Sequence, residues 1–287
     1  MTALAPGRAE LGSGRVTQFN VIRSEWIKLR SLRSTWFSLL ATVVIIVGLG
    51  TLFSALRAHR YNQELRAVHG GPVFVGPQPH ATIEGFDPTL ISLRGVFLAQ
   101  LAIGVLGVLV ITGEYSTGMI RSSVAAVPRR EPVLIAKALV FAVTALIVTE
   151  LAALAGFLLG QRALASTHLQ ASLSTPGAGR AVLGAGLYLT LIGLLAVGLG
   201  FLVRNTAGAI ATLFGIVFVL PLLVSALPSP YSTDVSKYLP LSAGTQIMVT
   251  TNPDPTILSP WAGLGVTALY ALAALMAGAV VLKRHDA

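Results

Sequence analysis

The sequence predicts an all-α integral membrane protein with six transmembrane helices. Of its 287 residues, 54% are apolar and only 11% are charged, and the mean hydropathy is +0.78. A soluble domain is typically about 25% charged. Lipid offers the backbone no hydrogen-bond partner, so each span must satisfy its own backbone as a helix. A β-barrel would show short alternating segments, whereas these apolar runs are continuous.

Six apolar runs are long enough to cross a bilayer, which takes about 20 residues. They are Trp36–Ala55, Leu90–Thr112, Val133–Gly160, Ala181–Val203, Ala207–Leu227 and Trp261–Leu282. The first run is longer than the roughly 7–15 apolar residues of a signal peptide, so we expect it to be retained. We expect a single transmembrane domain over residues 15–287. Residues 1–14 are small and polar without periodicity, which predicts a disordered tail.

The lysines and arginines predict that both termini are cytoplasmic, because cytoplasmic loops carry an excess of these residues. With the N-terminus inside, seven basic residues lie outside, namely Arg57, Arg60, Arg66, Arg94, Arg162, Arg180 and Lys237. The cytoplasmic side receives thirteen, namely Arg8, Arg15, Arg23, Lys28, Arg30, Arg33, Arg121, Arg129, Arg130, Lys137, Arg204, Lys283 and Arg284. We therefore attribute the net charge of +9 to topology and contact with anionic membrane lipids. We expect no nucleic-acid partner.

Residues 16–33 predict an amphipathic helix in the plane of the membrane surface. Apolar residues recur at a helical spacing of three and four, at Phe19, Ile22, Trp26 and Leu29. Basic residues lie mostly off that face, an arrangement typical of interfacial helices. Two interpretations stay open: an ordinary surface anchor, or a helix that also contacts a cytoplasmic partner.

Three longer segments lie on the predicted outer side. Residues 56–89 contain several glycines and prolines, which predicts an irregular, turn-rich loop. Residues 161–180 predict a flexible connector. Residues 228–260 include the semi-apolar stretch YLPLSAGTQIMV, which is either a short helix dipping back toward the outer leaflet or a simple loop.

The sequence shows no catalytic residue, no metal ligand and no directly bound cofactor. It contains no GxxxxGK[ST] segment, so it cannot bind ATP through a P-loop of its own. It also lacks GxSxG and has no cysteine. No metal-binding spacing occurs among its five histidines, which lie in predicted loops or the tail: His59, His69, His80, His168 and His285.

Arg94 and Glu150 are ionisable residues that lie within the predicted spans. Such residues cost roughly 2.5–3.5 kcal/mol each on insertion scales. Both fall in the outer half of the membrane, at depths that differ by about 8 Å at the helical rise per residue. They could pair with each other, Arg94 could instead reach the headgroups, or they could form a polar feature of a translocation path.

The loop between the second and third spans reads GEYSTGMIRSSVAAVPRREPVLIAK, from Gly113 to Lys137. Its first half predicts a short cytoplasmic helix that ends before Pro128. Glu131 and Pro132 then predict the start of the next helix, because an acid and a proline are favoured in a first turn. The loop is either a basic connector or a rigid projection that docks on a cytoplasmic subunit.

This loop resembles the E-x-x-x-G-x-(I/L)-R signature of ABC-2-type transporter permeases, which is followed by a proline, arginines and a lysine. In the same order along the chain, VIRSEWIKLRSLRSTWFSLLAT resembles the elbow helix and first span of bacterial members. KYLPLSAGTQI resembles their extracellular re-entrant segment. The resemblance covers essentially the whole chain.

The resemblance implies a permease without catalytic activity that works with a separate cytoplasmic ATPase, present in two copies, on which ATP and magnesium bind. A second permease copy would complete a homodimer or a paralogous heterodimer. By position, the elbow residues would be Glu25, Trp26, Lys28 and Arg30. The ATPase-coupling residues would be Glu114, Tyr115, Gly118, Met119, Ile120, Arg121, Pro128, Arg130 and Lys137.

Glu114 would meet a basic residue of the ATPase, or pair within the chain with Arg121 or Arg130. The expected function is export of an amphipathic or apolar compound, such as a drug or antibiotic, across a bacterial plasma membrane. Two alternatives are a transporter driven by an ion gradient and a membrane scaffold that transports nothing.

Overall fold

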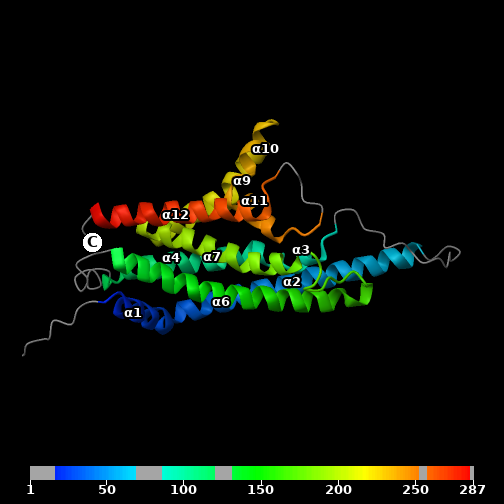
Figure 1. The fold of residues 1–287 in the computed structure, drawn as a ribbon, viewed down its shortest axis with the longest axis horizontal. Coiled ribbons are helices and arrows are strands. Elements are labelled where there is room, and N and C mark those ends of the chain that lie inside the picture. Colours follow the sequence, from blue (N-terminus) through cyan, green and yellow to red (C-terminus); the bar gives the residue numbers. More distant parts are fainter. Residues whose placement is uncertain (1–16, 69–85, 120–130, 252–256, 285–287) are drawn as a thin grey trace, which may run out of the picture.

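The computed structural model describes residues 17–68, 86–119, 131–251 and 257–284, and over these ranges it is helical without strands (Figure 1). The long helices are α2 (Arg33–Val68), α4 (Val96–Ser116), α6 (Glu131–Leu164), α7 (Ala178–Val203) and α12 (Pro260–Arg284). The others are α1 (Gln18–Ser31), α3 (Pro88–Ser92), α8 (Thr206–Phe214), α9 (Leu220–Ser225), α10 (Tyr231–Ser236) and α11 (Pro240–Thr245), with 3₁₀ turns η1 (Ala165–Thr167) and η3 (Gln246–Met248) and a π-helix η2 (Gly215–Val219).

Six helical segments of the described chain are long and apolar enough to cross a membrane, which confirms the number predicted. The fifth, Thr206–Ser225, consists of α8, η2 and α9 in succession. This architecture is compatible with a multi-pass membrane protein.

Helix α7 is the centre of the bundle. It packs against α4, α6 and α12, and α2 packs against α6 and α4 (Figure 1). In its most apolar stretch 72% of α7 is buried, against 28% for both α2 and α12. The outer helices instead expose large apolar side chains such as Phe37 and Leu269. The chain therefore has a packed interior around α7 and an apolar exterior suited to lipid.

Glycines allow α7 to approach its neighbours closely, as in other membrane helix pairs. A Cβ at Gly198 would lie 2.5 Å from the backbone carbonyl carbon of Ala274 in α12. A Cβ at Gly107 in α4 would lie 2.5 Å from the carbonyl oxygen of Gly193 in α7. These helices therefore touch backbone to backbone.

At one end of the bundle α1 meets the last turn of α4 and the start of α6; we call this the α1 end (Figure 1). At the opposite end Asp87 caps α3 and accepts hydrogen bonds from the backbone nitrogen (2.6 Å) and hydroxyl (2.8 Å) of Thr250. The side-chain nitrogen of Gln161 in α6 donates to Ser92 Oγ (2.8 Å). These contacts tie α3, α6 and the segment after η3 together.

Two boundaries predicted from the sequence are wrong. The second predicted span, Leu90–Thr112, is divided into α3 and α4 by a turn at residues 93–95. There Gly95 packs on α2, since a Cβ would lie 2.5 Å from the carbonyl oxygen of Ile46. The predicted irregular loop 56–89 is helical as far as Val68, because the first helix-breaking residues are Gly70 and Gly71. Residues 69–85 lie outside the described structure, as do residues 1–16 with the predicted tail.

For residues 228–260, before α12, the sequence allowed either a short helix or a simple loop, and the structure contains short helices there. Helix α11 and η3 bury Ala243 and Ile247 between α7 and α12. Helices α9 and α10 instead project from the bundle (Figure 1). Residues 161–180 were predicted to form a flexible connector. Their first residues instead belong to α6, which ends at Leu164, and Gln161 is held there by its hydrogen bond to Ser92.

Gly198→Ala should destabilise the protein by about 1–3 kcal/mol, because the added methyl group would overlap the α12 backbone. The change in unfolding temperature of the detergent-purified protein measures this effect. Gly265→Ala on α12 is the matched control, since nothing lies within 4 Å of its Cβ. Equal behaviour of the two variants would contradict the close α7–α12 contact.

Candidate functional site

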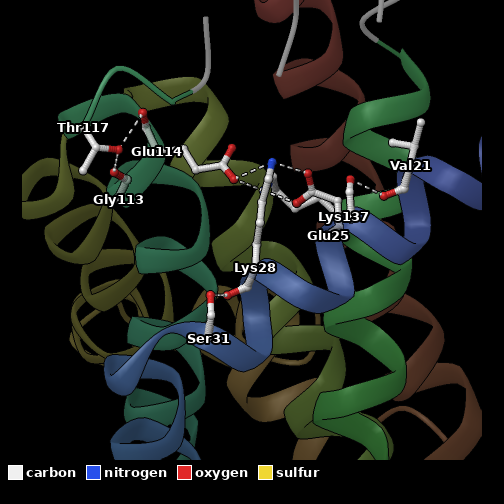
Figure 2. A network of polar contacts seen from close by, with 9 residues as sticks. Val21, Glu25, Lys28, Ser31, Gly113, Glu114, Thr117 and Lys137 are labelled. Carbon is white, nitrogen blue, oxygen red and sulfur yellow. Dashed lines mark hydrogen bonds and ion pairs between the residues drawn. The ribbon is translucent and has the colours of Figure 1, made fainter. Parts of the chain in front are cut away.

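Two glutamates and two lysines from three helices form a closed ring of ion pairs at the α1 end (Figure 2). Lys28 Nζ donates to Glu25 Oε1 (2.7 Å) and to Glu114 Oε1 (3.2 Å). Lys137 Nζ donates to Glu25 Oε2 (2.5 Å) and to Glu114 Oε1 (2.8 Å). We call these four residues the charge ring. Its charges alternate in sign and sum to zero.

Most of the charge ring is shielded from solvent. The exposed fraction of the side chain is 3% for Lys137, 4% for Glu25 and 7% for Glu114, whereas it is 28% for Lys28. Moving a charge out of water costs several kcal/mol unless an opposite charge and hydrogen bonds compensate. Each member therefore depends on the others to remain buried as an ion.

Helix α1 supplies Glu25 from its buried face. Val21, Glu25 and Leu29 follow each other at a spacing of four residues and are all buried. The apolar face predicted from the sequence differs in part: Leu29 is buried, whereas Phe19 and Trp26 are 72% and 46% exposed. The stripe with Glu25 was not predicted, because periodicity was read from the apolar residues alone, whereas the ring neutralises Glu25 inside.

Opposing effects act on the pKa of Lys28. Partial burial lowers it, but hydrogen bonds and Coulomb attraction from Glu25 and Glu114 outweigh burial, so the pKa is raised above its usual 10.5. A raised lysine pKa contributes stability that is fully present below pH 10.5 and is lost as the pH rises through the folded-state pKa. Lys28 therefore stays charged at physiological pH.

A small cavity of about 20 Å³ adjoins the ring and is walled by Leu29, Leu32, Val110 and Val140. Its volume is enough for about one water molecule. Glu114 also lines it, and Oε2 of this carboxylate is buried without a hydrogen-bond partner among the described residues. The ring thus keeps one acceptor available.

A second contact at the α1 end joins α4, α7 and α12. The guanidinium of Arg204 lies 5.5 Å from the ring centroid of Tyr115, and its Nη2 donates to the carbonyl oxygen of Val281 (3.0 Å). Arg204 caps α7 in a left-handed conformation, with φ at 57°. From the sequence, Arg204 was expected only to contribute to the excess of basic residues on the cytoplasmic side.

The structure brings together four of the site residues that the sequence suggested, namely the charge ring. Glu114 thereby pairs with Lys28 and Lys137, partners that the sequence analysis had not named for it. Gly118 follows α4 with a positive φ of 71°, and Met119 is 43% exposed. The remaining predicted coupling residues lie outside the described chain: Ile120, Arg121, Pro128 and Arg130.

Arg94 and Glu150 have separate surroundings. The Arg94 guanidinium lies 5.9 Å from the ring centroid of Phe53. Glu150 packs against Gly186 of α7, where a Cβ would overlap its carboxyl group. Neither residue takes part in an ion pair within the described ranges. No group of three or more potential metal ligands occurs there either.

Comparison with protein-family models and with curated proteins finds no match for this chain. The resemblance to ABC-2-type permeases is therefore a hypothesis that rests on the motifs of the sequence.

Lys137→Met should destabilise the protein by about 3–5 kcal/mol, because it leaves two buried carboxylates with one lysine. Unfolding of the purified protein measures this loss. Lys237→Met is the control: Lys237 also pairs with an acid, Asp234, but that carboxylate is 64% exposed, so little change is expected.

Glu114→Leu combined with Lys137→Met should recover most of the stability lost by Lys137→Met alone, because the Glu25–Lys28 pair remains neutral. A double-mutant cycle on the unfolding free energy gives the coupling. Additive losses would show that Glu114 and Lys137 act independently.

Proposed function

We propose that this chain is the membrane-spanning subunit of an ATP-driven exporter of the ABC-2 type. The observation that carries the proposal is the charge ring. It joins α1 to the end of α4 and the start of α6, the two helices that bracket the loop carrying the family-like motif. A displacement of that loop would therefore act on three helices at once, since none can move without separating buried charges.

In this proposal the loop docks on a separate cytoplasmic ATPase, which binds ATP and magnesium. Two ATPases and two membrane subunits, identical or paralogous, form the exporter. ATP binding brings the ATPases together, the loops follow, and the membrane subunits alternate between inward-open and outward-open arrangements. The charge ring acts as a rigid joint in this movement, and no residue of this chain performs catalysis.

The proposed location is a bacterial plasma membrane with both termini in the cytoplasm, so that the α1 end faces the ATPase. The packed interior around α7 consists of small, aliphatic and aromatic side chains, with no charged residue in α7 between Arg180 and Arg204. Such an interior suits an amphipathic or apolar cargo, for example a drug or an antibiotic.

One observation favours a second candidate, a transporter driven by an ion gradient. Glu150 carries a carboxyl group within the candidate span Pro132–Thr167, and intramembrane carboxylates commonly belong to ion pathways. A membrane scaffold without transport activity is a third possibility, which recovery of signalling proteins in place of an ATPase would support.

Glu150→Gln should leave ATP-dependent transport largely intact if the exporter proposal is correct, because the charge ring lies elsewhere. Uptake of a radiolabelled lipophilic cation into membrane vesicles, with and without ATP, measures this transport. Transport that needs no ATP and is lost in Glu150→Gln would favour the gradient-driven alternative instead.

The docking of the loop on an ATPase is tested by purification of the tagged chain from native membranes in mild detergent, followed by an ATP hydrolysis assay. A soluble ATPase should co-purify, and Met119→Asp should sharply lower its recovery because Met119 is exposed beside the loop. Leu173→Asp is the control, since Leu173 is similarly exposed, at 48%, but follows α6 at the opposite end. A single protein without hydrolytic activity would contradict the proposal.

A further inference from the structure

A groove separate from the charge ring lies between α1, α2 and α6. It has a volume of about 330 Å³ and is lined by Trp26, Leu29, Arg30, Thr35, Trp36, Leu39 and Thr144. This volume is within the range of roughly 300–1,000 Å³ that is typical of small-molecule sites. Its walls are mainly apolar, and both indole rings are substantially exposed, at 46% for Trp26 and 58% for Trp36.

The groove lies where a membrane surface would be. The first candidate span begins at Arg33, so Thr35 and Leu39 lie within roughly 9 Å of the start of that span at the rise of a helix. Tryptophan is enriched at this depth, where its ring meets both headgroups and acyl chains. Phe37 and Leu40, which follow on α2, are exposed apolar residues. The groove therefore opens toward lipid.

Two polar groups in the groove suit a phospholipid. Arg30 is exposed at its margin, and a guanidinium binds phosphate oxygens well. The Trp36 indole nitrogen donates to the carbonyl oxygen of Arg30 (3.0 Å) and so fixes the corner between α1 and α2. Thr35 is 3% exposed, and its hydroxyl has no hydrogen-bond partner among the described residues. A buried hydroxyl of this kind points to a ligand that accepts a hydrogen bond from it.

We propose that the groove binds one anionic phospholipid of the leaflet that contacts α1. An acyl chain packs among Trp26, Leu29 and Leu39, the phosphate pairs with Arg30, and an ester carbonyl accepts a hydrogen bond from Thr35. The lipid would hold α1 against α2 and α6 at a site whose lining includes none of the four charge-ring residues. This inference needs the chain to lie in a membrane but does not need it to be an exporter.

Tryptophan fluorescence tests the proposal, because two of the three tryptophans line the groove. In a Trp261→Phe background the protein is placed in phosphatidylcholine vesicles that contain brominated phosphatidylglycerol or, at equal mole fraction, brominated phosphatidylcholine. Bromine quenches indole fluorescence at contact. The anionic lipid should bind about fivefold more tightly, the factor expected for one basic residue at an anionic surface.

Arg30→Gln should abolish this preference, whereas Arg23→Gln should keep it, since Arg23 is an exposed arginine of the same helix that does not line the groove. Thr35→Val should lower the affinity for both lipids about fivefold, because each lipid carries an ester carbonyl that accepts the hydrogen bond from Thr35. Equal quenching by the two lipids, or the same loss in Arg23→Gln as in Arg30→Gln, would overturn the proposal. The proposal would also be overturned if neither brominated lipid quenched the fluorescence of Trp26 and Trp36, because a protein segment would then cover the groove.

Discussion

The placement of Lys137 between two buried carboxylates is the constraint on which the α1 end depends. A lysine side chain that is only 3% exposed needs both Glu25 and Glu114 beside its ammonium group, and these residues come from different helices. Apolar packing alone would tolerate small rotations of α1 over the bundle. Ion pairs at hydrogen-bond distance do not, because a small displacement would leave a charge buried without its counterion. The charge ring therefore specifies how α1, α4 and α6 are arranged more than it adds to stability.

The rest of the bundle is held by a different means. Between membrane helices, burial of apolar surface gives little driving force, because lipid tails are as apolar as leucine. Contact between backbones takes its place here, and the glycines of α7 make that contact possible. The helices are therefore held together in two ways, by close backbone packing at the centre and by the charge ring at the α1 end. The outer helices α2 and α12 are less buried, and their exposed apolar side chains suit contact with lipid.

The sequence predicted the six helical segments that could cross a membrane, because runs of about 20 apolar residues have few alternatives in lipid. It did not predict the partners of Glu114, since Lys28 and Lys137 are 86 and 23 residues away and periodicity describes only one helix at a time. One signal was present: Glu25 lies four residues from both Val21 and Leu29, in the middle of an apolar stripe. Asp87 before Pro88 was a further signal, since an acid followed by proline is typical of a helix N-terminus.

The separation of Glu25 and Lys137 along the chain also bears on how the protein is made. The two residues are 112 positions apart, so at roughly 5–20 residues per second a ribosome produces Lys137 on the order of ten seconds after Glu25. During that interval Lys28, three residues away on the same helix, is the only counterion in the ring that Glu25 can have. Until Lys137 has been made, α1 carries the Glu25–Lys28 pair without the ion pair that joins it to α6.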